Sequence, residues 1–91
     1  MTWKIEFVPA VAKELTSTER LPFLAFLHER IAPQEDPRSI GHALHGSTFG
    51  EFWRYRVGDW RIIVKIQDDK LTILVLRIGH RSTAYRNPVS R

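Results

Sequence analysis

The chain has 91 residues, 43% of them hydrophobic and 26% charged, which is the size and composition of a single soluble globular domain spanning residues 1–91. Cysteine is absent, which excludes disulfides and thiolate metal sites, and no apolar run approaches the roughly 18 residues that a membrane span needs. The N-terminus lacks the long apolar segment of a signal peptide, so we expect a cytoplasmic protein.

Positive charge is concentrated in the second half of the chain. Residues 1–50 hold five Lys and Arg against six Asp and Glu, whereas residues 51–91 hold nine against four, so the halves carry net charges of −1 and +5. Most of these cations are arginines, which suit bidentate contacts with phosphate. A nucleic-acid partner is the leading interpretation, and a solubilising basic surface is the alternative.

The first half of the chain predicts one strand and two helices. Residues 2–8 alternate between apolar and polar side chains, which is the period of a half-buried strand. Residues 10–15 favour a short helix, and the capping signal at 16–19 introduces a second helix over 19–31. The expected apolar stripe of this second helix consists of Leu21, Leu24, Leu27 and Ile31, with Phe23 beside it.

The second half predicts a loop and three strands. Residues 33–50 are rich in Pro, Gly, Ser and His, and strands are expected over 52–57, 60–66 and 71–78. The order β-α-α-β-β-β predicts an α+β domain, with two N-terminal helices packed on one face of a mainly antiparallel four-stranded sheet.

A two-residue turn at 58–59 sets the register of the first of these hairpins. It pairs Arg56 with Arg61, and alternation then puts the apolar residues of both strands on the helix side. A one-residue slip would invert this arrangement. Like charges placed opposite each other destabilise a sheet, which indicates an anion-binding surface on the face that the helices leave bare. The basic residues expected there are Arg54, Arg56, Arg61 and Lys65.

Other catalytic and binding motifs are weak or missing. His42, His45 and His80 have no carboxylate or cysteine nearby to complete a metal site, and the glycines at 46 and 50 lack the spacing and lysine of a phosphate-binding loop. No Ser or Cys has a clear base partner for acyl chemistry. We therefore expect neither a metal nor a cofactor.

The end of the last strand adds groups that suit phosphodiester cleavage. Gly79 is expected to turn the chain off the sheet and bring His80, Arg81 and Tyr85 toward the end that carries the arginines. Cleavage needs a base for the ribose 2′-OH, cations for the charge that develops on phosphorus, and an acid for the leaving 5′-oxygen. A surface that only binds is the alternative interpretation.

Two blocks of sequence resemble a known family. The block R-x-R-x-G-D-W-R at 54–61 and the block G-H-R-x-x-x-Y at 79–85 are similar to the RelE/ParE superfamily of bacterial toxins from type II toxin–antitoxin modules. The likeness extends to the DPRSIGHALHG loop and covers nearly the whole chain. It implies a RelE-like, microbial ribonuclease-like fold, and the arginines and the late tyrosine are closest to the RelE branch.

The resemblance also implies an activity and its partners. RelE members enter the ribosomal A site and cut mRNA by 2′-OH attack, leaving a 2′,3′-cyclic phosphate and blocking translation, and a cognate antitoxin holds each one inactive. Transferred by position, the substrate-binding residues are Arg54 and Arg56, which Lys65 joins from the same face, and the catalytic residues are Arg61, Arg81, Tyr85 and His80.

One departure from the family affects the chemistry. The well-studied branch has lysines at the positions of Arg54 and Arg56, and arginine does not serve as an acid or base, so proton transfer is assigned to Tyr85 or His80. Two alternatives stay open: a ParE-like inhibitor of DNA gyrase without nuclease activity, and a degenerate relative that only binds the antitoxin.

Overall fold

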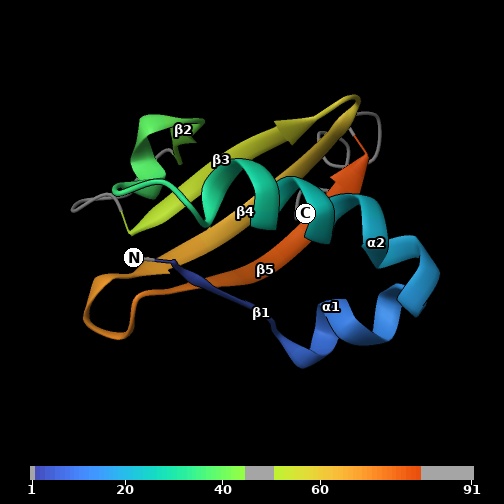
Figure 1. Ribbon diagram of the computed structural model, residues 1–91. Coiled ribbons are helices and arrows are strands. Elements are labelled where there is room, and N and C mark those ends of the chain that lie inside the picture. The colour runs from blue at the N-terminus through green and yellow to red at the C-terminus, as the bar shows by residue number, and fades with distance from the viewer. Residues whose placement is uncertain (1, 45–50, 81–91) are drawn as a thin grey trace.

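The computed structural model describes residues 2–44 and 51–80, so His45, Arg81 and Tyr85 of the predicted groups lie outside the described residues. Five strands form one sheet in the order β1-β5-β4-β3-β2, and two helices cover one of its faces (Figure 1). The strands are β1 (Lys4–Phe7), β2 (His42–Ala43), β3 (Phe52–Val57), β4 (Trp60–Gln67) and β5 (Thr72–His80). The helices are α1 (Pro9–Glu14) and α2 (Ser17–Phe26), and α2 continues into a π-helical turn, Leu27–Ile31.

The α+β class and the two helices are confirmed, but the four-stranded sheet is wrong. The sheet is mixed, because β1 runs parallel to β5, while the β5–β4, β4–β3 and β3–β2 pairs are antiparallel. The fifth strand, β2, has only two residues and is too short to produce an alternating pattern. The parallel pairing follows from the path of the chain, because α1 and α2 cross over the sheet between β1 and the strands that follow.

The second helix begins with the predicted capping box. The Thr16 hydroxyl accepts a hydrogen bond from the Glu19 backbone N–H at 3.1 Å, and the Glu19 carboxylate accepts one from the Thr16 N–H at 2.9 Å. The expected apolar stripe is wrong at Leu21, which is 59% exposed. The buried positions are Phe23, Leu27 and Ile31, four residues apart, and they turn toward the sheet, where Phe23 lies edge-on to Trp60 at 5.5 Å between ring centroids.

The β3–β4 hairpin has the predicted register. Val57 is opposite Trp60, and Arg56 is opposite Arg61. Tyr55, Ile62 and Val64 are fully buried on the helix side and form the centre of the core. The alternate residues of both strands therefore point to the face that the helices do not cover.

A β-bulge interrupts the pairing of β4 with β5. Ile63 is opposite Arg77 and Val64 is opposite Val75, so Leu76 is an extra residue without a partner in β4. The bulge shifts the alternation by one position. As a result Ile78 pairs with Ile62 in the core, and Arg77 reaches the uncovered face.

Within the described residues, no helix has both the length and the apolar character required to cross a membrane.

Candidate active site

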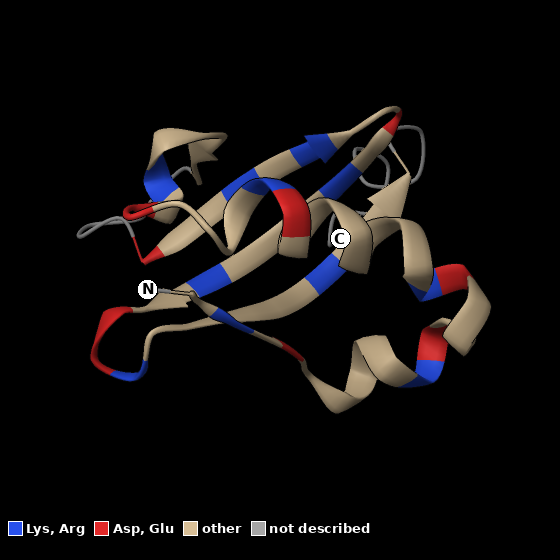
Figure 2. Cartoon of the chain, in the orientation of Figure 1, with Lys and Arg blue, Asp and Glu red and all other residues tan. Residues whose placement is uncertain are grey.

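The predicted basic residues share the uncovered face of the sheet. Arg54 and Arg56 come from β3, and Arg61 and Lys65 come from β4, in each case between residues that point into the core. Figure 2 shows Lys and Arg positions recurring across β3, β4 and β5. Arg77 adds a cation to this face, which the sequence does not predict, because simple alternation along β5 puts Arg77 on the side of Ile73 and Val75.

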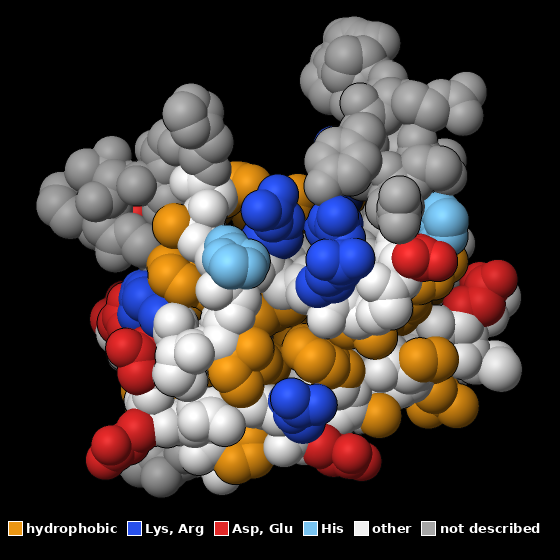
Figure 3. Space-filling model, turned by 90° about the horizontal axis from the view of Figure 1, so that it is seen from above, with side chains coloured by type: hydrophobic (Ala, Val, Ile, Leu, Met, Phe, Trp, Pro, Cys, Tyr) orange, Lys and Arg blue, Asp and Glu red, His pale blue; other side chains and the backbone are white. Residues whose placement is uncertain are grey.

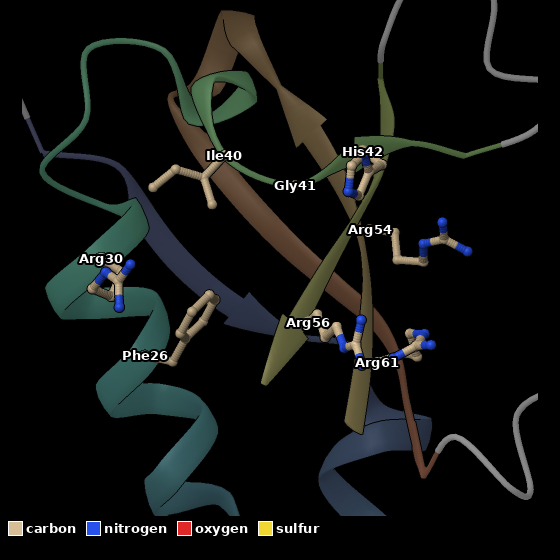
Figure 4. A pocket seen from close by; sticks show the side chains of 8 residues that line it. All are labelled: Phe26, Arg30, Ile40, Gly41, His42, Arg54, Arg56 and Arg61. Atoms are coloured by element: carbon tan, nitrogen blue, oxygen red, sulfur yellow. The ribbon is translucent and has the colours of Figure 1, made fainter. Parts of the chain in front are cut away.

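Three of these arginines line a cavity of about 360 Å³ at the outer edge of β3. The cavity extends around that edge to the end of the second helix, where the Arg30 guanidinium lies over the Phe26 ring at 6.0 Å. Figure 3 shows basic side chains gathered together in the view from above, with a histidine on either side of them. The lining residues, drawn in Figure 4, are Phe26, Arg30, Ile40, Gly41, His42, Arg54, Arg56 and Arg61.

His42 belongs to this group through the pairing of β2 with β3. It is the direct partner of Arg54 in the antiparallel ladder, so the two side chains lie on the same face. The imidazole is exposed and stands next to the guanidinium of Arg54 at one end of the cavity (Figure 4). The sequence pattern indicated His42 only as a weak metal ligand, because a two-residue strand gives no periodic signal.

A glycine allows the segment before His42 to cross closely over β3. Gly41 has φ of +88°, and a Cβ atom there would lie 2.5 Å from the Arg54 carbonyl oxygen and 2.7 Å from a ring carbon of Tyr55. The Trp53 indole N–H donates a hydrogen bond to the Ile40 carbonyl at 2.6 Å, which fixes the crossing. Residue 41 must therefore be glycine for His42 to take this position.

Two further interactions hold the loop that leads to this crossing. The buried Tyr55 hydroxyl donates to the Pro37 carbonyl at 2.7 Å. The Arg38 guanidinium makes two hydrogen bonds, of 3.0 and 2.9 Å, to the Asp68 carboxylate in the turn between β4 and β5. The hydrogen bonds from Arg38 lower the pKa of Asp68, and burial raises the pKa of Tyr55 far above the neutral range. The raised pKa keeps the Tyr55 hydroxyl protonated, as its donation to the Pro37 carbonyl requires.

The structure places His80 on the other face from the arginines. β5 continues through Gly79 to His80, so the expected turn off the sheet at Gly79 is wrong. His80 does reach the same end of the sheet as the β3–β4 turn. There it pairs with Trp60, and the two rings are edge-to-face with centroids 5.2 Å apart. Trp60 also contacts Phe23 of α2, so this stack lies on the helix side.

The described part of the chain holds no group of three or more His, Asp or Glu side chains that could bind a metal ion. Arg61 lines the cavity and is half-buried, and its Nη1 atom is screened from solvent. Electrostatic attraction is stronger where water is partly excluded, so this cation is suited to binding an anion.

Comparisons with known proteins relate the chain to bacterial toxins. Residues 5–85 match the family model described as the ParE toxin of type II toxin–antitoxin systems, parDE. The chain is 33% identical over 51 residues to Toxin RelG of Mycobacterium tuberculosis, and the match covers 56% of this chain and 58% of that relative. It thus spans little more than half of the length of the relative.

Solved structures share the fold. The toxin–antitoxin complex RelBE2 from Mycobacterium tuberculosis has a chain that matches with a TM-score of 0.66 and 19% identity, covering 90% of this chain and 94% of that one. The isolated Escherichia coli RelE toxin matches with a TM-score of 0.64 and 24% identity, covering 96% of this chain and 95% of that one. At these identities the likeness establishes a RelE-like fold.

Proposed function

The chain belongs to the ParE toxin family of type II toxin–antitoxin systems, and we propose that it acts as a ribosome-dependent endoribonuclease that cuts mRNA and thereby inhibits translation in the cytoplasm. The observation that carries the proposal is that Arg54, Arg56 and Arg61, which share the uncovered face, line one cavity.

The chemistry explains why several cations should meet there. When a ribose 2′-oxygen attacks the adjacent phosphorus, the 2′-O–P bond forms and the P–O5′ bond breaks, through a pentacovalent species that carries extra negative charge. Fixed guanidinium groups stabilise that charge and need no metal ion. The products are a 2′,3′-cyclic phosphate and a free 5′-hydroxyl.

The cations divide by position into two roles. Arg61, which lines the cavity and is half-buried, is proposed to contact the reacting phosphate, while Arg54, Arg56 and Lys65 bind the neighbouring RNA backbone. Arg81 and Tyr85 remain part of the proposed catalytic set through the family resemblance. A cognate antitoxin is the proposed inhibitory partner, because the solved structures that resemble the chain include toxin–antitoxin complexes.

The test is to map mRNA ends on purified translating ribosomes. The wild type is expected to cut within the codon in the A site and to leave a 2′,3′-cyclic phosphate. Arg61→Ala should reduce cutting by roughly 100-fold or more. The matched control, Lys13→Ala, removes an exposed cation from α1 on the helix side and should cut normally. Absence of cuts by the wild type would contradict the proposal.

Inhibition of DNA gyrase is the second candidate, and the family model that the chain matches favours it because that model is named for ParE. A supercoiling assay run beside the ribosome assay separates the two. Inhibited supercoiling without RNA cuts would support the ParE-like alternative. Neither activity, together with tight antitoxin binding, would support a degenerate relative.

A further inference from the structure

The proposed cleavage needs a group that accepts a proton, and the arginines of the cavity cannot supply it. Arginine stays protonated in proteins, so Arg30, Arg54, Arg56 and Arg61 act only as cations and hydrogen-bond donors. The other lining residues are Phe26, Ile40 and Gly41, which have no ionisable side chain, and His42. An imidazole is the side chain that exchanges protons near neutral pH.

We propose that His42 is a catalytic residue of this site and acts as the general base that takes the proton from the ribose 2′-OH. The inference rests on the proposed ribonuclease function and assigns a new residue to it. In the step, an imidazole nitrogen of His42 accepts the 2′-OH proton as the 2′-O–P bond forms. The P–O5′ bond breaks, and the leaving 5′-oxygen takes a proton from water.

The position of His42 supports this role. Directly opposed residues of an antiparallel pair have their Cβ atoms about 5 Å apart, so the imidazole and the Arg54 guanidinium are neighbours on one face. A phosphate bound by Arg54 would then bring the adjoining ribose next to His42. The imidazole is exposed, and RNA can reach it without displacing any described part of the fold.

The side chain is also carried by a fixed backbone. The hydrogen bond from Trp53 to Ile40, at 2.6 Å, and the close passage of Gly41 over β3 fix the two residues that come directly before His42. A catalytic base on a backbone held in this way keeps its place relative to the arginines. A plain surface histidine needs no such support.

The other described histidines do not meet these conditions. His80 packs against Trp60 on the helix side of the sheet. His28 is exposed on the π-helical turn after α2 and does not line the cavity. Of the three histidines within the described residues, only His42 lines the cavity together with the arginines.

The experiment measures single-turnover cleavage of ribosome-bound mRNA between pH 5 and pH 9. The proteins compared are the wild type, His42→Ala, His42→Gln and the matched control His28→Gln. The wild-type rate should rise with pH with unit slope and then level off. His42→Ala and His42→Gln should be roughly 100-fold slower or more and should lose this rise, while His28→Gln should match the wild type.

Two further readouts separate a base from a structural group. Added imidazole should restore part of the activity of His42→Ala, and RNA binding should stay within a few fold of the wild type. A His42→Ala variant that keeps the wild-type rate or the rising limb would overturn the inference and leave the ribonuclease proposal intact. A slow His42→Ala variant whose rate still rises with pH, and whose activity added imidazole does not restore, would also overturn the inference. If the wild type makes no cuts, both proposals fail together.

Discussion

Arg56 and Arg61 lie directly opposite each other across the β3–β4 hairpin, on the face of the sheet that no helix covers. Opposed like charges cost stability, so the pair indicates a surface selected to bind an anion. Arg56→Thr should therefore raise the free energy of unfolding by about 0.2–1 kcal/mol at low salt, because it removes the repulsion and adds a β-branched residue.

The same change should weaken RNA binding and cleavage. Urea unfolding with and without phosphate tests whether the arginine pair binds an anion, because phosphate should then stabilise the wild type more than Arg56→Thr. Equal stabilisation of both proteins by phosphate would show that the pair does not bind the anion.

Gly41→Ala should damage both the fold and the site. The residue has φ of +88°, and the added Cβ would meet the backbone oxygen of Arg54 and the ring of Tyr55. The backbone strain alone should lower the free energy of unfolding by about 1–3 kcal/mol, and the clash should lower it further. Gly58→Ala is the control, because φ is +60° but no atom lies within 4 Å of its Cβ, so its cost should stay near about 1–2 kcal/mol. Denaturant unfolding of the two variants checks the difference, and equal losses would contradict it.

Tyr55→Phe separates structure from proton transfer. The change removes the donor to the Pro37 carbonyl inside the core and should cost about 1–3 kcal/mol of stability. The pKa of Tyr55 is raised far above neutrality by burial, so the pH dependence of cleavage should not change. A shifted pH profile in the folded variant would show that Tyr55 takes part in the chemistry.

The contact between Arg38 and Asp68 should appear in the pH dependence of stability. The pKa of Asp68 is lower in the folded chain than its ordinary value of 3.8, because Arg38 hydrogen-bonds the ionised carboxylate. Stability gained this way is present above that ordinary value and is lost as the pH falls through the lower, folded value. The wild type should therefore exceed Asp68→Asn in stability at neutral pH, and the difference should vanish in acid.

The size of this effect is limited by exposure. The Asp68 side chain is 65% exposed, so the difference should stay below about 1 kcal/mol and shrink with added salt. Asp69→Asn alters the neighbouring exposed carboxylate of the same turn and serves as the control. A difference that persists after the pH has fallen below the folded pKa of Asp68 would show that the charge of Asp68 is not its cause.

Local signals in the sequence predicted the local parts of the fold. The capping residues Thr16 and Glu19 marked the start of α2, and the two-residue turn at 58–59 set the register that gathers Arg54, Arg56 and Arg61 on one face. In both cases the determining contacts lie within a few residues in the chain. The chemistry of short turns and caps was therefore sufficient.

The parts that could not be predicted depend on contacts between distant segments. The pairing of β1 with β5 joins residues nearly seventy positions apart, and nothing in either strand specifies its partner. His42 enters the site through a two-residue strand whose only sequence signal is the glycine before it. His80 was assigned to the arginine cluster because a turn off the sheet was expected at Gly79, whereas β5 continues through Gly79 and carries His80 onto the side of Trp60.

The extra residue at Leu76 has a consequence for how this chain can change in length. Deleting Leu76 would keep these pairings, because Arg77 would follow Val75 directly and still oppose Ile63, and Ile78 would still oppose Ile62 in the core. A single deletion would thus remove the bulge and leave both faces of the sheet unchanged, whereas pairing Leu76 with Ile63 at the present length would bring Arg77 opposite Ile62 in the core. A relative that lacks this residue can therefore keep the same core pairs by simple alternation along its last strand, but an alignment without a gap at this point would match core residues of one protein to surface residues of the other.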